Sequence, residues 1–381
     1  MTENVSSQLV QQFPSLISLA QPLQDSTELH IAVYSAHMSW SGVPSGLREC
    51  VDSALKLVCA APTFSKVADK AMPYRHEPDA NKATHAIVRS SPAWSIPSNE
   101  HLDEIQSALG LNPSPSPASR LKWFFSAAAT SIDFLESLPS STRAQIRKIR
   151  LNEDFKGVAA PACHSQGLIP FCQENPHLRI ERRVDLWRAV HIEGANILQI
   201  RRCPLPPLER IPTDYFINFI GEWIDEAHAL VPAGMPEGSH MLSFDASPDD
   251  LQTTFNLLKK VALWHEAKEE SRKRGGIIDQ PYDPKRPLEI QSRGRYYVSD
   301  TFIQAMKDAT QRPNSFVRFD CIVDPSWNLE PLIERSRGWY SHDWQDMFKE
   351  EFPRFLIPDP SMPRLSDIQR EYVYDPDQQE E

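Results

Sequence analysis

Apolar residues recur every three or four positions in several separate stretches of the chain, and this spacing predicts short amphipathic helices. In the N-terminal half, helices are expected over residues 45–60 and 98–109, the second with Ser98 as its N-cap. The most regular stripe predicts a helix of about four turns, which ends at Leu138-Pro139. Its apolar positions are Leu121, Phe125, Ala128, Ile132 and Leu135.

The C-terminal half contains further stretches with helical spacing, over residues 213–231, 247–274, 301–309 and 343–352. Thr213 or Asp214 is expected to cap the first of these helices. Ser247 is a suitable N-cap for the second, because Pro248 then occupies the first helical position, with acidic residues in the first turn. Within residues 324–381, only the helix at 343–352 is expected.

Strands are expected where β-branched and aromatic residues cluster or alternate with polar ones. Four such segments lie at residues 29–34, 146–151, 197–200 and 316–323. We therefore predict an α+β fold that is mainly helical, with a small sheet. The strand at 146–151 follows the helix that ends at Leu138, which makes one leucine-rich-like helix–strand unit. No second copy is apparent, so a repeat array is not expected.

Proline is unusually abundant, with 33 Pro against 13 Gly. Proline-rich stretches at 112–118 and 204–212 are predicted linkers. They separate an N-terminal region, a basic segment, a mainly helical region and an acidic tail, at residues 1–111, 119–203, 213–357 and 358–381. The parts are expected to pack as one compact domain. The scarcity of glycine argues against phosphate-binding loops, which need backbone without Cβ atoms.

The net charge of -11 disfavours nucleic acid as a partner, because phosphate contacts need a basic surface. The charge is uneven along the chain. Residues 120–202 contain 13 Lys and Arg against 8 Asp and Glu, so this segment is basic while its flanks are acidic. An acidic protein partner is therefore a candidate for the basic segment.

The six cysteines are scattered and form no Cys-x-x-Cys pair, so reduced thiols in the cytoplasm or nucleus are expected. The first fourteen residues lack the pattern of a signal peptide. No stretch of about 18 apolar residues occurs, so no membrane span is expected.

Within residues 119–188, several runs of sequence are similar to known proteins. They are Ile132 to Pro139, Ile146 to Asp154, Cys163-His164, Gly167 to Pro176 and Leu178 to Arg188. These runs resemble a family of uncharacterised filamentous-fungal proteins. The leucine–proline turn followed by an Ile-Arg strand is also similar to fungal F-box-like proteins, although no F-box helices precede it here. The resemblance implies a fungal, intracellular protein, and it implies no activity.

Cys163, His164 and Cys172 are weak candidates for a metal site, because their spacing fits known zinc-ligand patterns poorly. No cofactor is expected. Glu222, Asp225, Glu226 and His228 are helical neighbours, and a solvated acidic face explains them better than a carboxylate metal site does. Signatures of serine hydrolases, P-loop proteins and dinucleotide-binding proteins are missing from the sequence.

The basic cluster is the main candidate for function. It comprises Arg179, Arg182, Arg183 and Arg188, with Arg147 and Lys148 around the strand before them. One hypothesis is an interaction face for an acidic partner or for the protein's own acidic flanks, because arginine forms paired bonds with carboxylates. The alternative is pairing within the protein, with Glu153, Asp154, Glu181 and Asp185. Pairing or solvation is the usual role of such charge runs.

We therefore expect a non-enzymatic interaction or scaffold protein, adaptor-like by its similarity to F-box-like proteins. The alternative is an enzyme whose site is assembled from dispersed residues. The tryptophans are expected to anchor the core; they include Trp187, Trp223, Trp264, Trp327, Trp339 and Trp344.

Overall fold

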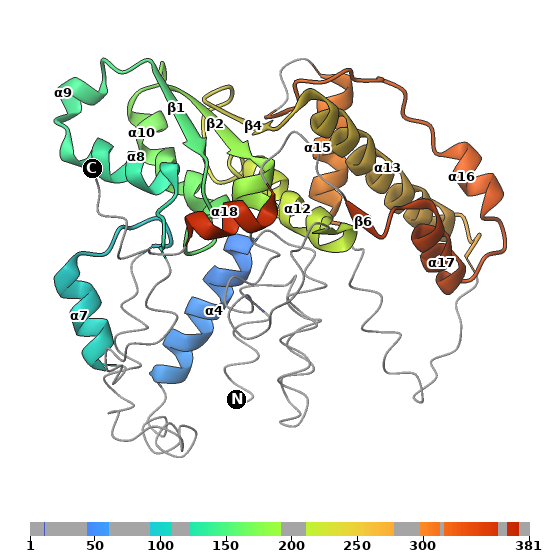
Figure 1. Ribbon diagram of the computed structural model, residues 1–381, viewed down its shortest axis with the longest axis horizontal. Helices are drawn as coiled ribbons and strands as arrows, with labels where there is room; N and C mark the ends of the chain where they lie inside the picture. The colour runs from blue at the N-terminus through green and yellow to red at the C-terminus, as the bar shows by residue number, and fades with distance from the viewer. Residues whose placement is uncertain are drawn as a thin grey trace.

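The computed structural model describes a mainly helical chain with a small sheet, so the predicted α+β class is confirmed (Figure 1). The described residues are 11, 44–60, 92–108, 122–191, 211–277, 298–312, 316–356 and 364–372. The predicted strands at 29–34 and 197–200 and the predicted linker at 112–118 lie outside them. Of the predicted linker at 204–212, only Ile211 and Pro212 are described, and they form a short strand. None of the described helices is both long enough and apolar enough to cross a membrane.

The main sheet has four strands in the order β1-β2-β4-β5, and every neighbouring pair is parallel. Its strands are β1 (Lys148–Glu153), β2 (Arg179–Asp185), β4 (His240–Asp245) and β5 (Val317–Arg318). A separate antiparallel pair joins β3 (Ile211–Pro212) to β6 (Phe355–Leu356). The strands of the main sheet thus follow one another in chain order.

Helices connect the parallel strands, because a parallel pair cannot be joined by a tight turn. The helices before and between the strands are α8 (Ala127–Ser137), α9 (Ser140–Arg143), η4 (Pro161–Leu168), α10 (Ile169–Glu174), η5 (Leu186–His191), α12 (Thr213–Ala229), α13 (Pro248–Lys273) and α15 (Asp300–Gln311). The predicted helix–strand unit is present as α8, α9 and β1. It is one of several units side by side, which are too unequal in length to appear as a sequence repeat.

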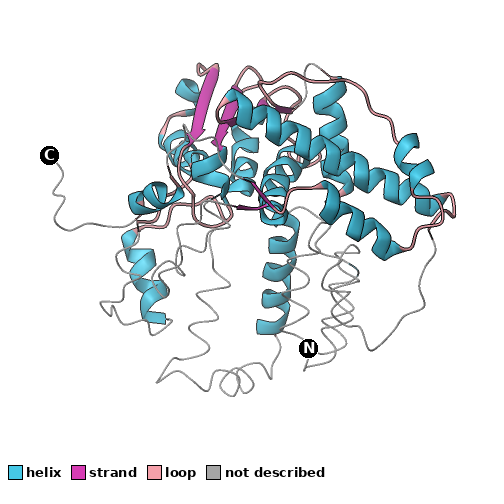
Figure 2. Cartoon of the chain, turned by 45° about the vertical axis from the view of Figure 1, so that its right-hand side comes forward, coloured by secondary structure: helices cyan, strands magenta, loops and turns pink. Residues whose placement is uncertain are grey.

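Helices cover one face of this sheet. Figure 2 shows its strands grouped at the top of the molecule, with most helices below and beside them. The covered face is lined by Leu151, Ile180, Val184, Leu242, Phe244 and Val317, all buried. Parallel sheets are usually covered on both faces. Here the opposite face is largely polar, and the side chains of Arg150 and Arg318 are 53% and 59% exposed.

We call this second side the open face. It is formed by Lys148, Arg150 and Asn152 of β1, Arg179, Glu181, Arg183 and Asp185 of β2, Met241, Ser243 and Asp245 of β4, and Arg318 of β5. The register places these residues on one side, because side chains alternate along a strand. Ser243 is the buried member of the set.

Two apolar clusters form the core. The larger joins the buried sides of α12, α13 and α15 to the later strands, and the smaller packs α8 and α10 against β1 and the start of β2. Four tryptophans are buried in the larger cluster, as predicted: Trp187, Trp223, Trp264 and Trp344. Trp327 and Trp339 are partly buried and pack against it.

Most of the predicted helices are confirmed within one or two residues. They are α4 (Pro44–Cys59), α7 (Asn99–Ala108), α12, α13, α15 and α17 (Ser341–Glu351). The Ser247 cap is also confirmed, since its side chain accepts a bond from the Asp250 N–H. The predicted cap of α12 is wrong, because Pro212 occupies the N-cap position and the Thr213 hydroxyl instead donates to the Pro353 carbonyl.

The helix with the most regular stripe is shorter than predicted. It begins at Ala127, because Ser126 caps it through the Ala129 N–H. The preceding residues are extended. There the Phe124 ring stacks on Phe155 at 4.4 Å, while the side chain of Phe125 is exposed. Tertiary packing thus overrides the helical spacing before residue 126.

Several elements were not predicted, among them β2, β4, α16 (Glu330–Arg335) and α18 (Leu365–Glu371). The short strands β3 and β6 and the short helices α9, η4, α10 and η5 were not predicted either. The expectation of one helix within 324–381 is therefore wrong. Helix α18 falls in the segment interpreted as an acidic tail, yet Ile368 and Tyr372 are buried in the larger cluster. The Tyr372 hydroxyl accepts from the Lys156 N–H and donates to the Arg188 carbonyl.

Candidate interaction face

The alternation of β2 separates the arginines that are clustered in the sequence. Arg179 and Arg183 lie on the open face, with Glu181 between them. Arg182 points to the covered face and Arg188 lies beyond the strand, in η5. The cluster is therefore divided among three environments.

Arg182 is 1% exposed, which corrects its assignment to an interaction face. Its Nε and Nη2 donate to Glu153 Oε1, at 2.9 and 2.6 Å. The remaining N–H groups donate to the carbonyls of Pro161 and Ala162 and to Ser165 Oγ. All five donors of the guanidinium are thus satisfied, and it lies 4.5 Å from the Trp223 ring centroid. No group remains for a partner to contact.

Arg188 is also engaged inside the protein. Its two terminal nitrogens donate to the two carboxylate oxygens of Glu371, at 2.7 and 3.0 Å. This paired geometry is the strong form of an arginine–carboxylate bond. Arg188 therefore attaches α18 to the end of β2, and pairing within the protein accounts for it.

On the open face, Glu181 neutralises part of the charge of β1. Its carboxylate lies 2.5 Å from Lys148 Nζ and 3.3 Å from Arg150 Nε. The bond from Lys148, with a smaller contribution from Arg150, lowers the pKa of Glu181. The predicted intramolecular pairing is therefore present here, but two cations share one carboxylate.

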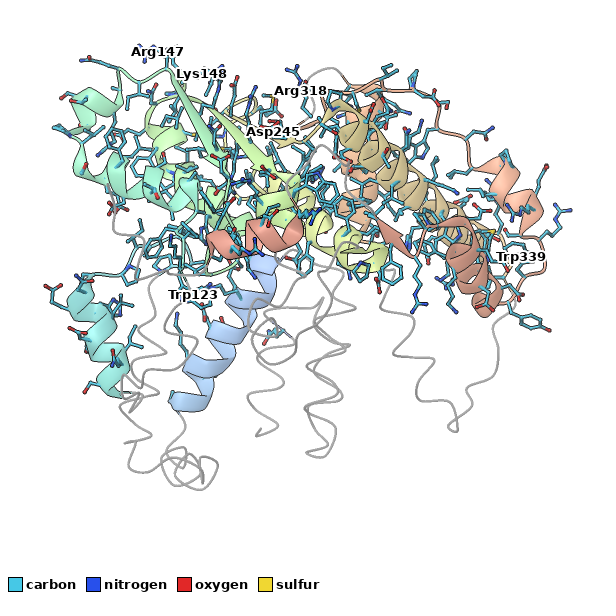
Figure 3. All side chains as sticks on the ribbon, viewed as in Figure 1. Trp123, Arg147, Lys148, Asp245, Arg318 and Trp339 are labelled. Carbon is cyan, nitrogen blue, oxygen red and sulfur yellow. The ribbon has the colours of Figure 1, made fainter. Side chains whose placement is uncertain are left out.

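Within the basic cluster, three arginines have no carboxylate partner in the described part of the chain: Arg147, Arg179 and Arg183. Arg147 donates to the Ala144 carbonyl, and Arg179 donates to the carbonyls of Pro176 and Leu178. Arg183 is exposed. Arg179 and Arg183 give the open face an excess of positive charge at the start and middle of the strands, and Arg147 lies just before β1. Figure 3 shows Arg147 and Lys148 at the start of β1 and Arg318 toward the other side of the sheet.

The strand register aligns a row of polar residues across the sheet. Arg183 pairs with Asn152 on one side and Ser243 on the other, and Ser243 pairs with Arg318. Arg318 Nη2 lies 2.7 Å from Asp320. This row therefore contains two arginines separated by a short side chain.

The next row along the strands is acidic, since Asp185 pairs with Asp245 at the ends of β2 and β4. Asp185 accepts from the N–H groups of Trp187 and Arg188 at the start of η5. Burial raises the pKa of Asp185, and the neighbouring Asp245 charge adds to the effect. The open face thus changes from basic to acidic along the strand direction.

The weak metal candidates are not arranged as a site. Burial raises the pKa of Cys163 to about 12 and that of Cys172 to about 11, so both thiols are protonated. Both ring nitrogens of His164 are engaged, with Ser126 Oγ at 2.7 Å and the Ala159 carbonyl at 2.8 Å. No group of three His, Cys, Asp or Glu among the described residues could hold a metal ion.

The acidic residues of α12 are not a solvated face, which corrects that interpretation. Asp225 and Glu226 are buried. Asp225 accepts from Ser299 Oγ at 2.6 Å, and Glu226 accepts from the Ser45 N–H at 2.6 Å and from Gln166 at 3.2 Å. Burial raises both pKa values, that of Asp225 to about 7.

Ser165 and His240 are of the types used in nucleophilic catalysis, and Ser165 Oγ lies 3.1 Å from His240 Nε2. Both residues are buried beneath the sheet. Burial lowers the pKa of His240 to about 3, and Arg182 donates to the same serine. This pair belongs to the hydrogen-bond network around Arg182 in the core.

The sequence does not indicate that Asn152, Ser243, Asp245 and Arg318 belong to the open face. Arg318 lies in a predicted strand, but its neighbours depend on β4, which was not predicted. The alternation of β2 is hidden because Arg182 occupies an inward position that is normally apolar. A strand assignment at 179–185 would have separated Arg179 and Arg183 from Arg182.

Comparisons of the chain with protein-family models, curated proteins and solved structures found no match. The resemblance of residues 119–188 to fungal proteins stays a prediction. The geometry of the open face is therefore the basis for the functional argument.

Proposed function

We propose that this protein is a non-enzymatic interaction protein that binds an acidic segment of a protein partner on its open face. The observation that supports this most directly is a parallel sheet with one polar face that none of the described helices covers. An uncovered parallel sheet is unusual, and repeat proteins with stacked strand units use extended surfaces of this kind for binding.

The rigidity of the face also favours binding. Its side chains project from paired strands, whose register fixes their spacing, so little order has to be gained on association. Arg179 and Arg183 have no carboxylate partner among the described residues, and their guanidinium groups are donors suited to carboxylates. Aspartate and glutamate side chains of a partner would supply the missing acceptors.

The strongly perturbed titratable groups support binding rather than catalysis. The side chains of His164, Asp225 and His240 are buried and hydrogen-bonded within the core. A catalytic group must reach its substrate, and these side chains contact neighbouring protein groups instead. The adaptor-like role and the cytoplasmic or nuclear location are parts of the same proposal.

The proposal is tested by comparing proteins captured from extracts of the source cell. The face variant is Arg179→Ser with Arg183→Ser. The control variant is Arg272→Ser with Arg312→Ser, which removes the same charge from two exposed residues, one in α13 and the other at the C-cap of α15. We expect a partner that wild type and the control variant capture and that the face variant does not.

Retention of every partner by the face variant would contradict the proposal, as would equal loss from both variants. Retention would place the interaction away from the open face, and equal loss would show that the effect is not specific to this face. Unchanged circular dichroism and melting temperature of the two variants would exclude unfolding as a cause.

A further inference from the structure

The net charge of each row of the open face varies from row to row along the strands. Arg179 pairs with Lys148 in the first row, Arg183 shares its row with Arg318, and Asp185 pairs with Asp245 in the last. The intermediate row contains Arg150, Glu181 and Met241, where the charges cancel. The net charge of a row is positive in the first and third rows and negative in the last, so it changes sign only along the strands. A ligand that matches this pattern must therefore lie along the strands.

The row with two arginines has the geometry of an anion clamp. Neighbouring strands lie about 4.8 Å apart, so the Cα atoms of Arg183 and Arg318 are separated by about 10 Å. Ser243 lies between them, and its short side chain leaves the space above it to the two long arginines. Both guanidinium groups can therefore approach one carboxylate above Ser243.

The two arginines differ in their existing partners. Arg318 contacts Asp320 at 2.7 Å, which orients its guanidinium. Arg183 has no ion-pair partner within the described part of the chain. A carboxylate placed between them would satisfy Arg183 and share Arg318 with Asp320 through charge-assisted bonds.

The acidic row of Asp185 and Asp245 limits which ligand side chain can come next to the carboxylate between Arg183 and Arg318. Asp185 and Asp245 face each other directly across β2 and β4. Like charges in directly opposite positions are destabilising. A positive group above this pair would relieve the repulsion, whereas a second carboxylate would increase it.

We infer that the open face binds an extended segment with segregated charges, one of whose carboxylates lies between Arg183 and Arg318 and whose lysine or arginine lies above Asp185 and Asp245. This inference rests on the proposed function and defines the chemical class of the partner. The acidic residues of the segment lie over the start and middle of the strands, and its basic residue lies over their ends.

Two synthetic peptides of equal length, composition and net charge test the inference with the full-length protein. One has its glutamates together, followed by its lysines, and the other has them alternating. Fluorescence anisotropy should show the segregated peptide binding at least tenfold more tightly, since a misplaced charge loses a charge-assisted bond. Equal affinities would overturn the inference.

Variants of the protein test which residues of the open face bind the segregated peptide. Arg183→Ser with Arg318→Ser should weaken the segregated peptide about tenfold, and the control Arg272→Ser with Arg312→Ser should not. Asp245→Lys should remove the preference over a wholly acidic peptide of equal length. An unchanged preference in Asp245→Lys, or tight binding by the double variant, would overturn the assignment of these residues.

The outcomes also separate this inference from the proposed function. If partner capture depends on Arg179 and Arg183 but the two peptides bind equally, the interaction face stands and the charge order is wrong. If a single-stranded RNA with as many phosphates as the peptide has glutamates competes as strongly as the segregated peptide, the inference that the face recognises carboxylates is wrong.

Discussion

Arg182 and Arg183 are adjacent in the sequence and have opposite environments, because successive side chains of a strand point to opposite faces. Arg182 is enclosed by Glu153, Ser165 and two backbone carbonyls. Arg183 is exposed on the open face. The charge cluster itself could be predicted from sequence, but the role of each arginine could not, since it depends on the unpredicted strand β2.

This difference predicts unequal effects of removing each charge. Arg182→Met leaves the buried carboxylate of Glu153 without its cation, which should lower the free energy of unfolding by about 3 to 5 kcal/mol. Arg183→Met is the matched control and should change it by less than about 0.5 kcal/mol. Urea denaturation measures both values. Similar losses for the two variants would show that the assigned environments are wrong.

Asp225 predicts a specific dependence of stability on pH. Burial raises its pKa from 3.8 to about 7, so between these values the folded protein binds a proton that the unfolded chain releases. The contribution of Asp225 to stability is therefore greatest at low pH and falls as pH rises toward 7. In Asp225→Asn this loss is absent.

Between pH 5 and pH 8, wild type should thus lose about 2 to 3 kcal/mol more stability than Asp225→Asn. The pKa of Glu226 is also raised by burial, but this residue is present in both proteins. Thermal unfolding at the two pH values measures the difference, with the exposed Asp103→Asn as control. Parallel pH profiles for wild type and Asp225→Asn would contradict a raised pKa at this site.

At the level of elements, local sequence patterns were sufficient to predict most of the longer helices. They were insufficient to predict two of the four strands of the main sheet, β2 and β4. Helices α7 and α13 begin after serine caps that the sequence reveals. Strand β4 is short and enclosed on both sides by other strands, so its stability comes from pairing with residues far away in the sequence. Strand β2 has charged residues at both inward and outward positions, which hides its period of two.

The two serine caps of α8 and α13 provide a test at this scale. Ser247→Ala removes one bond to the Asp250 N–H and should cost about 1 kcal/mol. Ser126→Ala removes the cap of α8 and also the partner of buried His164 Nδ1, so about 2 to 3 kcal/mol is expected. Chemical denaturation compares the two variants. Equal costs would mean that the Ser126–His164 bond contributes little.

At the level of the whole molecule, the candidate site is a property of the sheet. Asn152, Arg183, Ser243 and Arg318 come from four strands that are distant in the sequence, and only the register places them in one row. Composition and charge could predict that the basic segment interacts with acidic groups. They could not predict which arginines remain available, since burial and pairing remove Arg182 and Arg188 from the set.

The central claim is that the open face is the surface that contacts the partner, and site-specific photo-crosslinking tests it most directly. A photoreactive residue replaces Asn152, which is exposed on the open face, or Asn256, which is exposed on α13. We expect a crosslink from position 152 to an acidic segment of the captured partner and none from position 256. A crosslink from position 256 alone would contradict the account and place the interaction on the helices.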